Sequence, residues 1–197
     1  MPKKYRIKPS KKCQSCEKAA DCEYLKQSFQ KPFDVSAILV DCNAFYIVFC
    51  ELEERCRIPF GDSEKMKQYH EDMVAGKRPF LNPAMVTNGM LAAELALKAL
   101  IFRENGCFDC IHEIDTLFYS LPEPHQETLL KTIKNKTTYG DDSVKSTLEI
   151  YRNAFNDWRY FFDSDSVGSN DFMSKFIHIV CDYAIAQFDN DSSEVMG

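Results

Sequence analysis

Apolar residues recur along this chain at intervals of three and four, which is the spacing of one face of an α-helix. Residues 82–105 show the pattern most clearly. Asn82 suits the capping position, and Pro83 suits the first helical turn, where no backbone donor is needed. From Leu91 to Ile101 the residues are apolar on nearly all sides. Only Glu94 and Lys98 interrupt them, and these lie one turn apart, where they can pair. A helix this apolar is buried by its neighbours, so the segment predicts a helical bundle.

Other segments repeat the helical spacing, and no strand pattern accompanies them. Gly106 ends the first helix, and a second is predicted from residue 107 to Leu121, just before Pro122. Its apolar side carries Cys107, Cys110, Ile111, Ile114, Leu117 and Phe118. Five more helices are predicted over residues 34–56, 63–75, 123–136, 143–162 and 170–188. The expected organisation is an all-α bundle over residues 34–188, preceded by a loosely structured arm (1–33) and followed by a disordered tail (189–197).

The composition is that of an ordinary soluble domain. The chain has 197 residues, of which 45% are hydrophobic, enough for one core. Its basic start is not followed by an apolar run, so no secretory signal is expected. The most apolar segment, Val35 to Phe49, is too short to span a bilayer and contains Asp41 and Asn43. We therefore expect a cytoplasmic protein that does not enter a membrane.

The net charge of −6 conceals a strong asymmetry. Residues 1–12 contain six basic residues and no acidic one. The rest of the chain therefore contains 18 basic and 30 acidic residues. A body this acidic offers no broad nucleic-acid surface. The basic arm is interpreted as a solvated tail, and contact with a phosphate backbone is the alternative.

Three patches of sequence resemble the HEPN superfamily of helical-bundle domains. They are Glu94-Leu95-Ala96-Leu97-Lys98-Ala99, then the triplet His112-Glu113-Ile114 after a Gly break, and later Trp158-Arg159-Tyr160. The resemblance covers roughly residues 83–188. It implies a HEPN-like bundle, commonly a homodimer, in a prokaryotic stress, defence or toxin–antitoxin context. Some members of that superfamily are metal-independent ribonucleases, and others only bind nucleotides or partner proteins.

The candidate site follows from this resemblance. Catalytic members carry an Arg, a polar residue and, a few residues later, a His that acts on the 2′-hydroxyl. Here Arg152 and Asn153 match the opening, but no His follows at 157–159. The general acid–base group is therefore missing, which favours binding through Arg152, Arg159 and His112 over catalysis. The alternative interpretation is that both arginines pair with acids on neighbouring helices.

The cysteines suggest a second candidate site. Cys13, Cys16 and Cys22 are close enough in sequence for their thiolates to reach one Zn²⁺, with a fourth ligand to come from Cys42, Cys56 or His70. An iron–sulfur cluster and plain free thiols are the alternatives. Cys107 and Cys110 share a face with Ile114, so they are interpreted as core residues. His178 is expected on a solvent-exposed face, and His125 has no evident partner.

These observations predict a HEPN-like domain that acts by binding RNA, a nucleotide or an operon-encoded partner protein. One alternative is a divergent endoribonuclease toxin that uses Arg152 with a non-standard partner. Another is a metal-stabilised adaptor. A homodimer is expected through a helix whose aromatic residues exceed what one core face needs, namely Tyr151, Phe155, Trp158, Tyr160, Phe161 and Phe162.

Overall fold

A computed structural model describes residues 35–56, 62–77, 81–105, 111–137, 139–152 and 170–194. The elements within these ranges are α3 (Val35–Cys56), α4 (Ser63–Val74), α5 (Asn82–Asn105), α6 (Ile114–Tyr119), α7 (Glu123–Lys136), α8 (Asp141–Ile150) and α10 (Asn170–Glu194). Every regular element in this part of the chain is an α-helix, and none is a strand. The predicted all-α class is confirmed.

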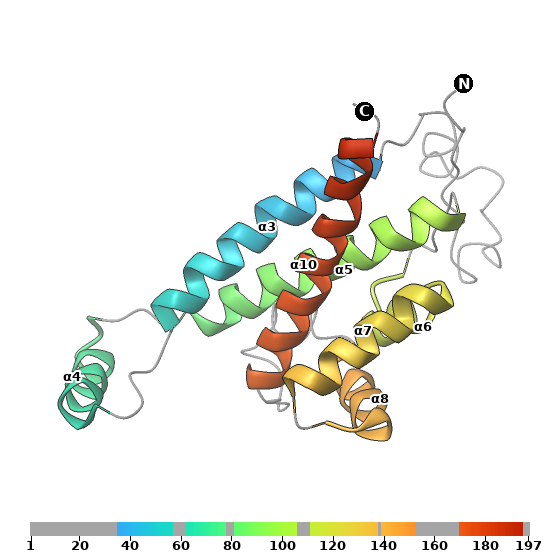
Figure 1. Cartoon of the computed structure of the whole chain (residues 1–197). Coiled ribbons are helices and arrows are strands. Elements are labelled where there is room, and N and C mark those ends of the chain that lie inside the picture. Colours follow the sequence, from blue (N-terminus) through green and yellow to red (C-terminus); the bar gives the residue numbers. More distant parts are fainter. Residues whose placement is uncertain are drawn as a thin grey trace, which may run out of the picture.

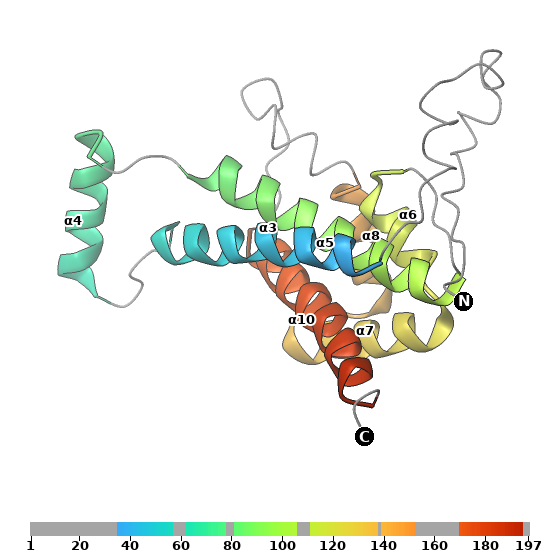
Figure 2. The same ribbon diagram turned by 90° about the horizontal axis from the view of Figure 1, so that it is seen from above.

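Helix α5 lies at the centre of the bundle. Helix α3 runs along it, α10 crosses it, and α6 packs near its C-terminal half, with α7 and α8 beyond (Figure 1). Helix α4 stands apart from the other helices in both views (Figure 2). The two longest neighbours thus cover α5 from different sides. This explains why its sequence is apolar almost all round, as expected for a helix with no solvent face.

Small residues on α5 allow α3 and α10 to approach it closely. Gly89, Ala92, Ala93, Ala96 and Ala99 follow one another at helical spacing, and all are buried. The Cys42 thiol of α3 donates a hydrogen bond to the carbonyl of Ala92, with 3.4 Å between sulfur and oxygen. A Cβ built on Gly89 would lie 2.6 Å from Ile177 Cδ1 of α10 and 2.6 Å from Phe49 Cδ2 of α3. Glycine is therefore required sterically where the three helices meet.

Most predicted helix boundaries are close to the observed ones. Helices α5 and α7 coincide with the predicted ranges, and α3 and α4 differ from them by one residue at one end. Asp62 caps α4, since its side chain accepts a hydrogen bond from the backbone N–H of Lys65 at 3.0 Å. That bond lowers the Asp62 pKa. Residue 34, where the sequence predicted the start of α3, lies outside the described residues.

Three predicted boundaries differ from the observed ones by more than two residues. Helix α6 begins at Ile114, because Glu113 has extended backbone angles and residues 111–113 are not helical. Helix α8 ends at Ile150 and does not continue to residue 162, since Tyr151 and Arg152 form a turn. Helix α10 continues to Glu194, where the sequence predicted a disordered tail from residue 189. The arm, residues 153–169 and residues 195–197 lie outside the described residues.

Substitution of Gly89 tests the close packing at this crossing. Alanine is the better helix former by up to about 1 kcal/mol. However, its methyl group would overpack against Phe49 and Ile177, which are both fully buried. Overpacking of a core costs about 1–3 kcal/mol, so Gly89→Ala is expected to lower the free energy of unfolding. Chemical denaturation monitored by circular dichroism measures the change.

Gly140→Ala is the matched control, because a Cβ there meets nothing within 4 Å. It should leave stability within about 0.5 kcal/mol of the wild type. A Gly89→Ala protein as stable as the Gly140→Ala protein would show that the three helices do not meet this closely.

Candidate functional site

The buried pair of Glu94 and Lys98 marks the polar centre of α5. Both side chains are almost fully buried, and Lys98 Nζ lies 2.6 Å from Glu94 Oε1. The pairing predicted from their four-residue spacing is confirmed. Two charges removed from water in this way are tolerated only together, since either one alone would be an uncompensated buried charge.

His112 binds the same carboxylate from the segment that precedes α6. Its Nδ1 lies 2.9 Å from Glu94 Oε1, while 61% of its side chain is exposed. Glu94 is acceptor-only when ionised, so Nδ1 carries the proton and Nε2 points away from that bond. Glu94 Oε2 is the one buried side-chain oxygen or nitrogen without a hydrogen-bond partner in the described part of the chain. A hydrogen-bond donor at Oε2 would offset the free-energy cost of burying this oxygen without a partner.

Arg152 is held by a second buried carboxylate. Its Nε and Nη2 donate to Asp115 Oδ2 at 2.9 and 2.7 Å. Asp115 belongs to the first turn of α6 and is buried, whereas 47% of the Arg152 side chain is exposed. The hydrogen bond and the charge of Asp115 raise the Arg152 pKa. Arg152 therefore pairs with an acid on a neighbouring helix, as the alternative interpretation of the sequence proposed.

These two carboxylate pairs meet at the start of α6. The backbone N–H of Ile114 donates to the carbonyl of Arg152 at 3.1 Å, so the turn after α8 lies against the residue pair 113–114. We call this group the α6 cluster; it consists of Glu94, Lys98, His112, Asp115 and Arg152. The two more exposed members are His112 and Arg152. The buried Glu94 orients His112, and the buried Asp115 orients Arg152.

The structure brings together two of the predicted site residues and leaves the others untested. His112 and Arg152 both belong to the α6 cluster, whereas Asn153 and Arg159 lie outside the described residues. So do Cys13, Cys16 and Cys22, the predicted zinc ligands, and Cys107 and Cys110, which the sequence predicted to be core residues. Among the residues that are described, no group of three or more His, Cys, Asp or Glu side chains could hold a metal ion.

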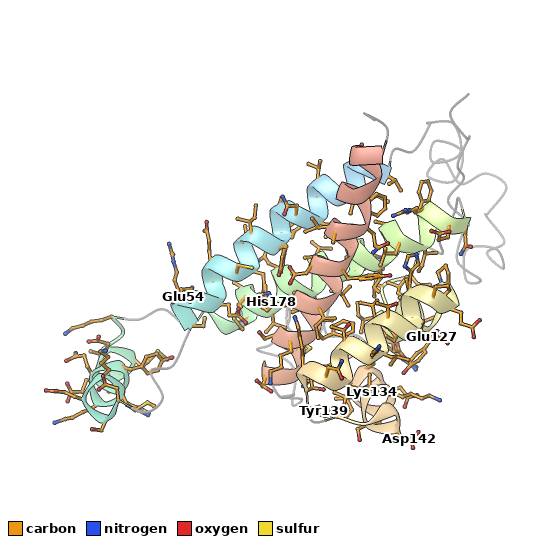
Figure 3. The ribbon with its side chains drawn as sticks, viewed as in Figure 1. Glu54, Glu127, Lys134, Tyr139, Asp142 and His178 are labelled. Carbon is orange, nitrogen blue, oxygen red and sulfur yellow. The ribbon has the colours of Figure 1, made fainter. Side chains whose placement is uncertain are left out.

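A second polar cluster, which the sequence analysis missed, joins α3 to α10. The Tyr46 hydroxyl donates to Asp182 Oδ1 at 2.7 Å and lies 2.6 Å from His178 Nδ1. His178 Nε2 lies 2.8 Å from Glu53 Oε2, and Ser174 donates to the other oxygen of Glu53. Figure 3 shows His178 on α10, and its ring nitrogens contact Tyr46 and Glu53 of α3. His178 is therefore half-buried and bonded on both ring nitrogens, and its predicted place on a solvent-exposed face was wrong.

The protons in this α3–α10 cluster can be counted. Tyr46 has one hydroxyl proton and gives it to Asp182, so His178 Nδ1 must donate to the Tyr46 oxygen. Glu53 accepts only, so Nε2 must carry a proton as well. All three hydrogen bonds form together only when His178 is an imidazolium. Consistently, the hydrogen bond to Glu53 raises the His178 pKa, despite the opposing effects of burial and of Lys136 on α7.

Neighbouring groups in this cluster respond to the same burial and negative charge. Burial, followed by the hydrogen bond to Asp182, raises the Tyr46 pKa far above its usual range. Burial and Glu53 raise the Cys50 pKa, and burial raises that of Cys181. The tyrosine and both thiols are therefore neutral at physiological pH, so neither cysteine offers a thiolate nucleophile here.

A sequence signal for this cluster existed on one helix only. Ser174, His178 and Asp182 recur every four residues, so they form a polar line along α10. Their partners Tyr46 and Glu53 lie more than 120 positions earlier, on a helix that reads as apolar. His125, which has no evident sequence partner, is likewise bonded in the structure, with its Nδ1 2.7 Å from the Tyr183 hydroxyl.

Comparison of this chain with protein-family models, with curated proteins and with solved structures found no match. The all-α fold and the two polar clusters therefore stand on the structure itself. The likeness to the HEPN superfamily is carried by the residues quoted above.

Removal of Glu94 should expose the cost of burying Lys98. In Glu94→Gln the ammonium group would remain in the core without a carboxylate, which is expected to lower the free energy of unfolding by about 3 kcal/mol. The double variant Glu94→Leu with Lys98→Met should recover most of that loss, because it replaces the pair with apolar side chains. Urea unfolding of the wild type, Glu94→Gln and the double variant measures these differences in the free energy of unfolding. A loss below about 0.5 kcal/mol for Glu94→Gln would contradict a buried pair.

The His178 contacts predict a pH dependence of stability with a definite sign. The folded-state pKa is raised above the ordinary value of 6.5. The stabilisation that protonated His178 contributes to the fold is therefore complete below pH 6.5, and it is lost as the pH rises through the raised folded-state pKa. The difference in unfolding free energy between the wild type and His178→Gln should shrink over that interval. His70→Gln, on exposed α4, is the matched control. A difference that grows with pH would contradict the proton count.

Proposed function

We propose that this protein is a HEPN-like helical domain that acts by binding, and that the α6 cluster holds a phosphate group of its ligand. The ligand class is a nucleotide or the end of an RNA strand. The observation that carries the proposal is the pairing of each exposed nitrogen-rich side chain with a buried acid. Asp115 orients Arg152, and Glu94 orients His112. Such anchoring lowers the entropic cost of presenting a donor to a ligand.

The electrostatics of the cluster favour a small ligand over a long polyanion. Glu113 and Glu149 lie close enough to Arg152 to raise its pKa, so the surroundings of the guanidinium are acidic. Arg152 uses Nε and Nη2 for Asp115, which leaves Nη1 for a phosphate oxygen. A single charge-assisted contact of this kind suits one phosphate. The acidic body would repel an extended duplex.

Ribonuclease activity is the second candidate function, and a specific observation favours it. A histidine whose Nδ1–H is fixed by a buried carboxylate keeps Nε2 available as a proton acceptor, which is the arrangement of a general base. His112 on Glu94 has this arrangement. It would replace the catalytic His that is absent after Arg152. We rank binding first because the resemblance supplies no catalytic role for this histidine.

One titration distinguishes these functions. The purified protein is mixed with AMP and with a short single-stranded RNA, and binding is followed by calorimetry. Arg152→Ala is expected to weaken binding about 10- to 100-fold, since one charge-assisted hydrogen bond contributes about 1.5–3 kcal/mol. Lys145→Ala removes the same charge from exposed α8 and should leave affinity unchanged. Circular dichroism confirms that each variant is folded.

The same RNA sample is then analysed for cleavage in the presence of a chelator. Intact RNA supports binding without catalysis. Cleavage by the wild type that is lost in both Arg152→Ala and His112→Ala would establish the ribonuclease alternative. Equal affinity of the wild type and Arg152→Ala would contradict the proposed site.

A further inference from the structure

A further group of polar side chains lies where the start of α7 meets α5 and α10, apart from the two clusters described above. His125, in the first turn of α7, is at its centre. The Nδ1 atom of His125 lies 2.7 Å from the Tyr183 hydroxyl on α10. Its Nε2 atom lies 3.5 Å from Glu104 Oε1, near the end of α5. We call this group the α7 triad; it consists of Glu104, His125 and Tyr183. An acid, a histidine and a hydroxyl thus follow one another across three helices.

The two contacts of His125 indicate which ring nitrogen carries the proton. An ionised carboxylate only accepts hydrogen bonds, so Nε2, which faces Glu104, carries the proton of the neutral ring. Nδ1 then has a lone pair and accepts the hydroxyl proton of Tyr183. The 3.5 Å contact with Glu104 is long for a hydrogen bond. It suits an ion pair that forms once His125 gains a second proton, and contacts of this kind tighten as a reaction proceeds.

The surroundings of Tyr183 support its anion while making a base necessary. Burial raises the Tyr183 pKa, so the phenol is neutral at physiological pH without assistance. A hydrogen bond with the Thr128 side chain and the charge of Arg103 act in the opposite direction. Both groups therefore favour the phenolate as it forms. A hydroxyl with a proton acceptor at 2.7 Å, and with neighbours that stabilise its anion, has the arrangement of an activated nucleophile.

The nucleophile is accessible from solvent, whereas its base is held in place by packing. Tyr183 is partly exposed, and 44% of the Glu104 side chain is exposed. His125 is buried, and its ring meets the Tyr183 ring edge-on with 5.7 Å between the ring centroids. A buried imidazole with both nitrogens facing polar groups keeps one orientation. The proton acceptor is therefore pre-positioned for a reaction at the Tyr183 oxygen.

We propose that Tyr183 is the acyl acceptor of a second chemical site and that the acyl donor is a neutral carboxylic ester. The Tyr183 oxygen attacks the carbonyl carbon while His125 Nδ1 takes the phenol proton, and the imidazolium pairs with Glu104. The ester C–O bond then breaks, and the alcohol leaves with the proton from His125. An ester and a phenol are converted into an acyl-tyrosine and an alcohol, so the step needs no other reactant.

Charge at the α7 triad favours a neutral donor over a phosphate ester. Arg103 is the adjacent cation, and the protein already uses it. Its Nη1 donates to the Gln187 carbonyl at 2.7 Å, and its guanidinium lies 5.1 Å from the centre of the Phe188 ring. Its Nε lies 3.8 Å from Glu104 Oε1. A phosphate would meet the Glu104 carboxylate, and like charges repel, whereas a neutral ester avoids that cost. The proposal is independent of the ligand proposed for the α6 cluster.

Acetyl transfer from 4-nitrophenyl acetate to the chain tests the proposal. Mass spectrometry of proteolytic peptides follows the acetylation of each tyrosine over time. Tyr183 is expected to react about tenfold or more faster than Tyr119, because a positioned general base contributes at least that much. Tyr119, which is 38% exposed on α6, is more exposed than Tyr183 and is the matched control within the same protein. Tyr183→Phe should remove the fast phase of 4-nitrophenolate release.

Variants separate the base from the residue that positions it. His125→Gln should lower the rate of Tyr183 acetylation to that of Tyr119, because the proton acceptor is lost. Glu104→Gln should lower it about tenfold, since the imidazolium loses its counter-charge. Glu104→Asp keeps the charge and should recover most of that loss. Neither Glu104 variant should shift the thermal midpoint, because the side chain is largely exposed. A purely structural role of Glu104 would leave the Tyr183 rate unchanged.

Three results would overturn the proposal. The first is an equal acetylation rate for Tyr183 and Tyr119 in the wild type. The second is a His125→Gln protein, folded by circular dichroism, in which Tyr183 reacts as fast as in the wild type. Should that variant not fold, an equal Tyr183 rate in the wild type and Glu104→Gln would decide against the triad. The third is phosphorylation of Tyr183 by 4-nitrophenyl phosphate in place of acetylation, which would contradict the neutral donor.

Discussion

Enclosure of α5 on nearly every side is the constraint on which the rest of the bundle depends. A helix with no polar face must be covered by several neighbours, and α3, α10 and α6 provide that cover. Because Phe49 and Ile177 converge on one position of α5, only glycine fits there. Helix α3 covers α5 with one face, and Val40, Ile47 and Val48 on its opposite face are exposed.

Buried acids organise the polar chemistry of this protein. Glu94 and Asp115 are removed from water, and each holds a nitrogen-rich side chain that remains partly exposed. The α3–α10 cluster follows a related pattern, with Glu53 and Asp182 on either side of a histidine–tyrosine contact. In both clusters the acid fixes the geometry of a neighbour that can exchange a proton or bind an anion. Loss of the acid would therefore affect stability and chemistry together.

The two bonded histidines differ in what their surroundings permit. His112 has one ring nitrogen on Glu94 and most of its side chain in water, so its other nitrogen is accessible to a ligand. His178 uses both ring nitrogens within the protein, which ties its charge to the contact between α3 and α10. The first arrangement suits a binding or catalytic site. The second couples helix packing to pH.

The sequence by itself determined the all-α class, the near-complete burial of α5 and the pairing of Glu94 with Lys98. These follow from spacings of three and four residues, which a helix converts directly into shared faces. It also placed most helix ends within a residue, because residues such as Asn82, Pro83, Gly106 and Pro122 mark them locally. The tertiary structure decided which distant residues meet. Asp115 and Arg152 are 37 positions apart, and Glu53 and His178 are 125 apart. No local pattern encodes such pairs, since they depend on how the helices cross. The early end of α8 depends on a distant contact too, because the Arg152 carbonyl accepts a hydrogen bond from α6.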